Sequence, residues 1–308
     1  MAALKTPADA RKPGVRILGV AAVLIVIIAV VVGLVCGFQR SMIYFPDTSA
    51  VPPADQALVG GENLTLHTTD GLELEAYFAP PAPEAQDREL AVLVAPGNAA
   101  NRYNRVGLGE QLQAEGFSVL LMDYRGYSTN PGRPSQDGLI RDGHAALDAL
   151  EELGFPAERA IYFGESIGGG VIAALLAERP PAGAVFRSPF TELADVGRHH
   201  YPWLPVGLIL RDRFPVIEHV RDTEVPISVI RAEYDSVVPT ELSAQVADAA
   251  ETWWQSTSWT PTTTTRKCTA PLSPRLWPSL RTPSTLMTKL FLDAVSCWVY
   301  CHGTRPHQ

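Results

Sequence analysis

The chain contains little cysteine, has no excess of positive charge and has one long stretch without histidine. Only four of its 308 residues are cysteine, one in an apolar segment and three near the C-terminus, so cysteine usage indicates nothing about the redox compartment. The formal net charge of −8 disfavours nucleic acid as a partner. No histidine lies between His219 and His302.

The most informative stretch is Gly-Glu-Ser-Ile-Gly at residues 164–168. A short apolar run of strand type precedes it at 160–163, and an apolar run of helix type follows at 169–178. The pattern G-x-S-x-G between a strand and a helix is typical of a nucleophile elbow, in which a sharp turn exposes a serine hydroxyl above the sheet. Ser166 is therefore predicted to be a nucleophile, and the backbone amide of Ile167 to face an oxyanion. The alternative is a plain strand-to-helix turn.

Two more stretches have the pattern of a buried strand followed by a turn. Residues 90–95 are apolar and lead into a loop at 96–101, and residues 118–123 lead into Tyr-Arg-Gly-Tyr-Ser at 124–128. Together with the elbow and with Tyr-Phe-Pro at 44–46, these motifs appear in an order that is specific to one group of proteins.

In these motifs the chain resembles the α/β-hydrolase superfamily and, within it, the membrane-anchored, depalmitoylase-like serine hydrolases. The resemblance covers about residues 39–250. It implies hydrolysis of an acyl ester or thioester by a Ser-His-Asp mechanism without a cofactor, with the backbone amide of Asn98 as the second oxyanion donor. Pro96 stands where that family usually has histidine, and proline removes a side-chain donor from the loop.

The acid of such a triad follows the elbow in the chain. Residues 225–232 have the pattern of a strand, and Asp235 comes just after it, where sheets of this kind place catalytic groups. Asp235 is the predicted acid, and Glu233 is a weaker candidate. An aspartate that only caps the following helix, at 240–250, is the alternative.

The catalytic histidine is missing from its expected place, about 25 to 30 residues past the acid. The composition changes near residue 251, because five of the six Trp, three of the four Cys and the run at 262–265, four threonines, fall in 251–308. His302, which lies 67 residues after Asp235, is the remaining candidate in the right chain order.

A reading-frame shift near residue 251 is our hypothesis for this change. Read from the third base of each codon, Trp253-Trp254 becomes Val, Trp254-Gln255 becomes Ala, and each Thr-Thr junction becomes His, Asp, Asn or Tyr. The sequence translated in this other frame can therefore contain a histidine 27 to 30 residues after Asp235. We expect the tail 251–308 to form neither the last edge strand nor the last helix, and to supply no working base. A linker rich in Thr, Pro and Ser is the alternative.

The remaining histidines are predicted to be ordinary. His67 and His144 fall on a strand and a helix, and the pair His199 and His200 falls in a segment expected to cap the site, residues 194–222. Two adjacent histidines suggest a metal, but the segment lacks a recognisable set of ligands, so no metal site is predicted.

An apolar segment near the N-terminus, residues 17–38, contains no charged side chain. At ~1.5 Å per residue it is long enough to cross a hydrocarbon core of ~30 Å. It exceeds the apolar core of about 7 to 15 residues in a secretory signal, and no cleavage site follows it. Basic residues are concentrated before it, so residues 1–16 are expected in the cytoplasm and the hydrolase domain, 44–250, on the outer side of the membrane.

Strands and helices alternate from residue 90 onward, with helices expected at 106–115 and 137–153 and an antiparallel strand pair ahead of them at 64–67 and 72–78. The predicted class is α/β, an α/β-hydrolase fold with a mostly parallel sheet flanked by helices. The apolar cap and the anchor favour a lipidic acyl ester or thioester as substrate and membrane lipid as a partner. Two alternatives remain: a membrane-tethered binding protein without activity, and a serine aminopeptidase-like peptidase.

Overall fold

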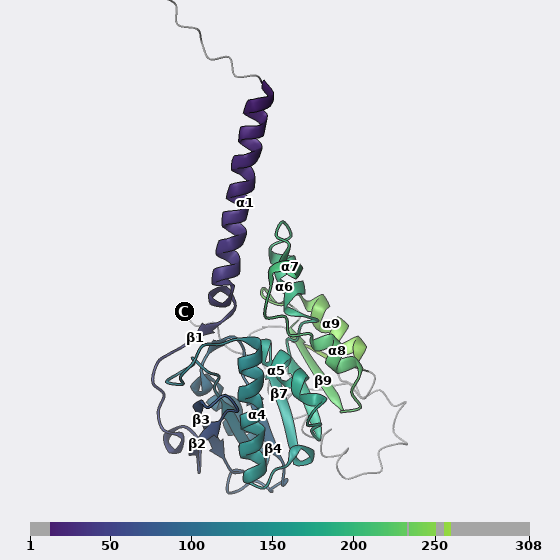
Figure 1. The fold of residues 1–308 in the computed structure, drawn as a ribbon. Helices are drawn as coiled ribbons and strands as arrows, with labels where there is room; N and C mark the ends of the chain where they lie inside the picture. Colours follow the sequence, from purple (N-terminus) through teal and green to yellow (C-terminus); the bar gives the residue numbers. More distant parts are fainter. Residues whose placement is uncertain (1–12, 233, 251–255, 260–308) are drawn as a thin grey trace, which may run out of the picture. The chain divides into compact units, whose positions relative to one another are not determined.

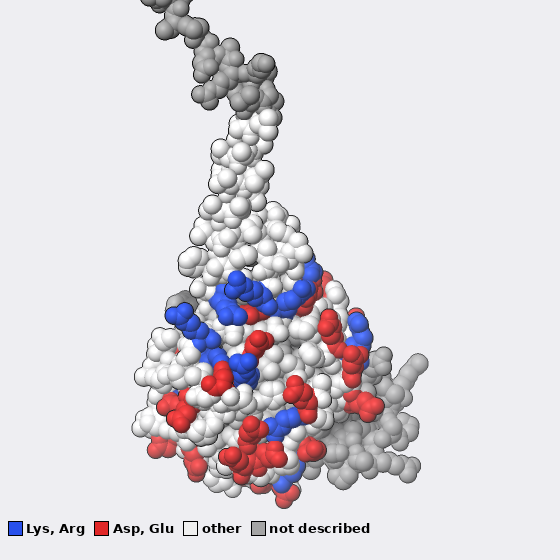
Figure 2. All heavy atoms as spheres, in the orientation of Figure 1, with Lys and Arg blue, Asp and Glu red and all other residues white. Residues whose placement is uncertain are grey.

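The computed structural model describes residues 13–232, 234–250 and 256–259. The chain divides into two units, Met1–Met42 and Ile43–Gln308. The described part of the first unit lies in the helix α1 (Pro13–Ile43), whose last residue belongs to the second unit. The helix begins four residues before and ends five residues after the predicted segment. Its stretch Leu18–Ile43 has a mean hydropathy of 3.3 and qualifies as a membrane span by length and composition, a test that a signal sequence also passes. In Figure 2 the helix is free of charged side chains over most of its length.

The second unit is built on an eight-stranded sheet with the order β10-β9-β8-β7-β4-β6-β3-β2. The pairs β2–β3 and β3–β6 are antiparallel, and the others are parallel. The strands are β2 (Glu62–His67), β3 (Glu73–Ala79), β4 (Ala91–Ala95), β6 (Ser118–Met122), β7 (Ala160–Glu165), β8 (Gly183–Arg187), β9 (Ile227–Ala232) and β10 (Ser256–Trp259). The predicted fold class is confirmed: an antiparallel pair precedes a parallel sheet whose strands alternate with helices.

Helices cover both faces of this sheet because its central strands are apolar on both sides (Figure 1). Leu93 of β4 packs in the cluster formed with one set of helices, whereas Val92 and Val94 pack in the cluster formed with the other set. The first set is α4 (Gln136–Glu152), α5 (Ile167–Leu176), α8 (Val216–Arg221) and α9 (Thr240–Ala249), and the second is α2 (Ala54–Ala57) and α3 (Val106–Ala114). The short elements that complete the described part are β1 (Phe45–Pro46), β5 (Ala99–Ala100), α6 (Leu193–His200), α7 (Val206–Ile209) and the 3-10 turns η1 (Arg102–Arg105) and η2 (Ala157–Arg159).

The prediction that the chain beyond residue 250 forms no edge strand was wrong. β10 pairs in parallel with β9, with Ser256 opposite Val229 and Trp259 opposite Ala232. The prediction relied on the absence of a hydrophobic period, but an open sheet edge offers backbone donors and acceptors to any extended segment, and Thr and Trp favour strands. The last helix, His302 and most of 251–308 lie outside the described residues.

The turn after β6 is fixed by buried ion pairs. The Arg125 guanidinium donates to Asp142 from Nε at 2.9 Å, and from Nη1 and Nη2 to both oxygens of Asp70 at 2.7 and 3.0 Å. Asp123, at the start of the turn, accepts from the backbone N–H and the Nη1 of Arg102 at 2.7 and 2.8 Å. Because every buried charge has a partner, the turn is held in one geometry.

The Asp70–Arg125 pair predicts a specific pH dependence of stability. Hydrogen bonds from Arg125, and then from Thr68, hold the pKa of Asp70 well below its usual range. A carboxylate with a lowered folded-state pKa stabilises the fold above its ordinary pKa of about 4, and this stabilisation is lost as the pH falls through the folded-state value. Asp70→Asn should therefore lower the free energy of unfolding by about 1–2 kcal/mol at neutral pH, and its deficit should shrink below a pH of about 4.

Urea unfolding of the detergent-solubilised chain at several pH values measures this effect. Asp55→Asn, a change at an exposed aspartate of α2, is the matched control and should leave stability within about 0.5 kcal/mol. A deficit of Asp70→Asn that stays constant from neutral to acid pH would contradict the assignment.

Candidate active site

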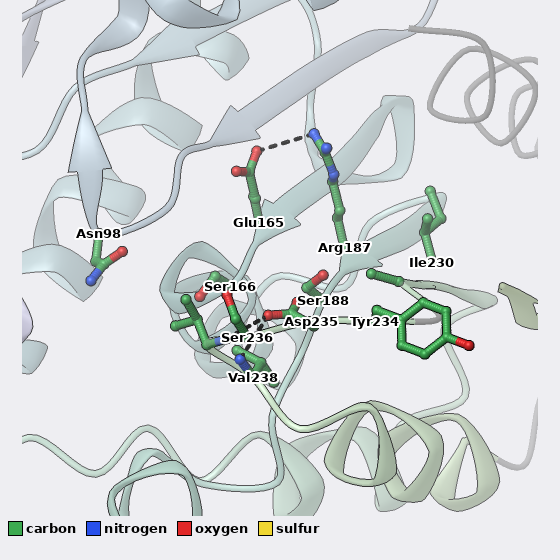
Figure 3. Close-up of a pocket in the computed structure, with 12 residues that line it drawn as sticks. Asn98, Glu165, Ser166, Arg187, Ser188, Ile230, Tyr234, Asp235, Ser236 and Val238 are labelled. Carbon is green, nitrogen blue, oxygen red and sulfur yellow. Dashed lines mark hydrogen bonds and ion pairs between the residues drawn. The ribbon is translucent and has the colours of Figure 1, made fainter. Parts of the chain in front are cut away.

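Ser166 occupies a strained turn between β7 and α5. Its φ and ψ are 51° and −113°, a conformation that L-residues rarely adopt. The backbone N–H of Ser166 donates to the carbonyl of Arg187 at 2.8 Å, and its carbonyl accepts from Gly169 N–H at 2.9 Å. These bonds fix the turn, so the side chain of Ser166 lies above the carboxyl end of the sheet, as predicted for a nucleophile elbow (Figure 3).

The two outer glycines of the elbow are required by close backbone contacts. A Cβ on Gly164 would lie 2.6 Å from the Gly168 carbonyl oxygen, and a Cβ on Gly168 would lie 2.2 and 2.6 Å from the carbonyl oxygens of Ala95 and Pro96. Real Cβ atoms do not approach other atoms so closely. The start of α5 therefore packs directly on the end of β4 and on the loop that follows it.

That loop, residues 96–101, lies beside the elbow. A Cβ on Gly97 would be 3.9 Å from the Cβ of Ser166. The side chain of Asn98 donates from Nδ2 to the carbonyl of Ile43 at 2.7 Å, so it is engaged away from the serine. The backbone N–H groups of Asn98 and Ile167, the two predicted oxyanion donors, donate no hydrogen bond within the part of the chain that the structure describes.

Asp235 lies in the loop between β9 and α9 and lines the same cavity as Ser166. Its Oδ1 accepts from the backbone N–H groups of Val237 and Val238, both at 2.9 Å. Helix α9 begins after Pro239 without a side-chain cap, so the alternative that Asp235 caps this helix is wrong. One carboxylate oxygen thus holds the loop, and Oδ2 accepts no hydrogen bond within the described residues.

A cavity of about 320 Å³ joins these groups. Figure 3 shows Ser166 and Asp235 on one side of it and Asn98 across from them. Its lining comes from the carboxyl ends of β7, β8 and β9 and from the loops after β4 and β9: Asn98, Glu165, Ser166, Arg187, Ser188, Ile230, Ala232, Tyr234, Asp235, Ser236, Val237 and Val238. The geometry therefore brings together four predicted site elements: the nucleophile, the acid, the oxyanion loop and the elbow helix.

Known proteins are similar to this chain in sequence and in fold. Residues 86–215 match the family model described as serine aminopeptidase, S33. An uncharacterized protein of Mycobacterium tuberculosis, MT2364, is 42% identical over 236 residues, which cover 76% of this chain and 83% of that protein. The chain belongs to the α/β-hydrolase superfamily.

More distant proteins agree with this assignment. The lysophosphatidylserine lipase ABHD12 of Danio rerio is 28% identical to this chain over 242 residues. The matched region covers 67% of this chain and 63% of that protein. The solved structure of the Pyrococcus furiosus esterase Pf2001 has a TM-score of 0.56 at 18% identity and covers 70% of this chain and 90% of that one, a likeness of fold. The predictions of an α/β-hydrolase fold and of an α/β-hydrolase enzyme are confirmed.

A charged cluster beside Ser166 was not found in the sequence. Glu165 precedes the serine, and its Oε1 lies 3.0 Å from Arg105 Nη2, while its Oε2 lies 3.5 Å from Arg187 Nη1. Glu165 and Arg187 are cross-strand partners of β7 and β8. Their proximity follows from the register between the two strands, which the sequence alone does not give.

The histidines of the described part do not bond to Ser166 or to the Asp235 carboxylate. His200 Nε2 lies 2.8 Å from the carbonyl oxygen of Val237, a residue that lines the cavity, and the His199 ring packs against the His200 ring. His67 lies 3.9 Å from Glu73, His144 lies 3.5 Å from Glu178, and His219 lies on α8. The candidate base His302 and the spare carboxylate Glu233 lie outside the described residues.

The strain at Ser166 gives a testable prediction. Glycine tolerates the observed backbone angles, so Ser166→Gly should remove strain of roughly 1–3 kcal/mol. It should also cost about 0.5–1 kcal/mol in chain entropy. We expect a net gain of about 1 kcal/mol in the free energy of unfolding. In the chain whose C-terminal reading frame has been restored, we also expect loss of turnover of a chromogenic ester.

The matched control is Glu89→Gly, at an exposed residue whose φ is 54° and which lies in the loop before β4. It should give a similar gain in stability without loss of turnover. If only the Glu89 variant is stabilised, the elbow stores no strain.

Proposed function

We propose that this α/β-hydrolase cleaves an acyl ester or thioester with Ser166 as nucleophile and Asp235 as the acid of a Ser-His-Asp triad. The observation that carries the proposal is the strained Ser166, which shares one cavity with Asp235 and the loop of Asn98. A non-glycine residue keeps such backbone angles only where the surrounding structure enforces them, and such positions concentrate at functional sites.

In this mechanism the Ser166 hydroxyl attacks the acyl carbonyl and transfers its proton to a histidine that Asp235 orients. The carbonyl oxygen becomes an oxyanion, which accepts hydrogen bonds from the backbone N–H groups of Ile167 and Asn98. Each donor contributes on the order of 3 kcal/mol to transition-state stabilisation. The alcohol or thiol leaves with the proton from the histidine, and water then releases the acyl group by the same steps in reverse order.

The substrate is proposed to be lipidic. The segment between β8 and β9 exposes apolar side chains at Tyr201, Trp203 and Leu208, and the chain carries a helix that qualifies as a membrane span. The relative from Danio rerio is named as a lysophosphatidylserine lipase, which is in keeping with a lipid acyl ester. We propose a single-pass anchor with the N-terminus in the cytoplasm and the hydrolase unit on the outer side, because Lys5, Arg11, Lys12 and Arg16 precede the span.

A peptidase is the second candidate, and the name of the matching family model favours it. An aminopeptidase needs an acidic pocket for the substrate amine. The carboxylate of Glu165 lines the cavity but is engaged by Arg105 and Arg187. We therefore expect p-nitrophenyl esters to be hydrolysed in preference to aminoacyl amides. The opposite preference would support the peptidase.

The nucleophile is tested by Ser166→Ala in the chain whose C-terminal reading frame has been restored. The change should leave the fold intact and lower kcat for p-nitrophenyl esters by on the order of 10⁴ to 10⁶. It should also abolish covalent labelling by a fluorophosphonate probe. If a substantial share of the turnover or labelling remains, the nucleophile is misassigned; if the parent itself shows neither, the protein is a binding protein on a hydrolase fold.

The frame-shift proposal concerns the base. The printed chain should show only the residual turnover that an oxyanion hole supplies without a base, and restoring the frame should raise kcat by on the order of 10³-fold or more. The control is the restored chain carrying Ser166→Ala. Sequencing of the coding DNA tests the frame shift directly. An intact, well-supported reading frame through codons 250 to 308 would refute it.

A further inference from the structure

Two buried tyrosines hold the loop that carries the proposed oxyanion donor. The hydroxyl of Tyr124 donates to the carbonyl of Pro96 at 3.0 Å, and the hydroxyl of Tyr127 donates to the carbonyl of Asn98 at 2.8 Å. Both residues come from the turn after β6, and their rings pack edge to face with centroids 5.7 Å apart. Burial raises the pKa of both phenols well above the ordinary value, so both hydroxyls remain protonated donors.

These two bonds determine the orientation of the peptide between them. A peptide unit is planar, so fixing its carbonyl also fixes the N–H on the other side of the same plane. The Pro96 and Asn98 carbonyls belong to the units on either side of the Gly97–Asn98 peptide, which carries the N–H of Asn98. Gly97 has no side chain to restrict rotation. Without the flanking bonds, this N–H is free to turn away from the cavity.

Other contacts support only one of the two carbonyls. The Asn98 carbonyl also accepts from the backbone N–H of Phe45 at 2.8 Å, because β1 pairs with β5 just beyond it. For the Pro96 carbonyl, Tyr124 is the one hydrogen-bond donor among the described residues. Proline at position 96 offers no donor of its own, so the loop depends on donors from the neighbouring turn.

We propose that Tyr124 and Tyr127 are positioning residues of this hydrolase, whose hydroxyls hold the loop of residues 96–98 so that the N–H of Asn98 faces the substrate oxyanion. The proposal rests on the proposed roles of Ser166 and Asn98. The tyrosines touch neither substrate nor nucleophile in this scheme; they act through the backbone of the loop. Because each bond fixes one side of the Gly97–Asn98 peptide, loss of either is expected to lower transition-state stabilisation more than substrate binding.

The test compares Tyr124→Phe and Tyr127→Phe with Tyr162→Phe in the full chain whose C-terminal reading frame has been restored. Tyr162 is a matched control: it is buried and its hydroxyl donates to a backbone carbonyl, that of Arg179, at 2.8 Å, but neither residue lines the site cavity. Amide hydrogen exchange of the peptide that spans 96–101 should accelerate about ten-fold or more in the two site variants and stay unchanged in the control. The kcat for a p-nitrophenyl ester should fall about ten-fold in each site variant with KM within about two-fold, while the control keeps its kcat.

The outcomes separate positioning from general stability. The proposal is overturned if the melting temperature falls equally in all three variants while amide exchange of the loop and kcat are the same in all three. The tyrosines would then only stabilise the core. A fall in activity that resides in KM would overturn it as well. The exchange measurement does not require turnover, so it decides whether the tyrosines hold the loop even if the parent shows no Ser166-dependent activity, a result that would instead refute the proposed function.

Discussion

The contact between the start of α5 and the end of β4 is the constraint on which the rest of the site depends. Backbone meets backbone there, since a Cβ at Gly168 would lie 2.2 Å from the carbonyl oxygen of Ala95. At such a contact neither segment can move without the other, because no flexible side chain lies between them. The elbow that presents Ser166 and the loop that presents Asn98 therefore behave as one rigid unit. This rigidity is what sustains the unfavourable backbone angles of the serine.

The turn after β6 supports this unit from the other side. Arg125 and Asp142 are buried, and burial of an ion pair costs free energy unless every group has a partner. Here the guanidinium of Arg125 donates to the carboxylates of both Asp70 and Asp142. The backbone N–H of Arg125 also donates to Asp142, and this bond fixes the backbone of the turn. The turn thus transmits its rigidity to the loop through the two tyrosine hydroxyls.

The parts of the site that the sequence predicts are those whose determinants are local. The elbow is encoded in five consecutive residues, and Asp235 comes three residues after a strand, so both could be located without knowing the sheet order. The pairing of Glu165 with Arg187 and the hydrogen bonds from Tyr124 and Tyr127 could not be predicted in this way. They depend on strand register and on contacts between segments about 20 to 30 residues apart. The edge strand β10 was missed for a different reason: its sequence has no hydrophobic period, and an open sheet edge does not require one.

The position of β10 bears on where a base can enter the site. β10 runs parallel to β9, so the chain leaves both strands at the same edge of the sheet, the edge where Ser166 lies. Asp235 follows the end of β9, at Ala232, by three residues, and codon 262 follows the end of β10, at Trp259, by three residues. Trp259 is the register partner of Ala232. A strand of the restored frame in the place of β10 would bring a histidine encoded at 262–265 just past its end, as Asp235 comes just past the end of β9, in the neighbouring position along the edge. That arrangement would place a base beside Asp235, whereas His302 comes 43 residues past the end of β10 in the sequence.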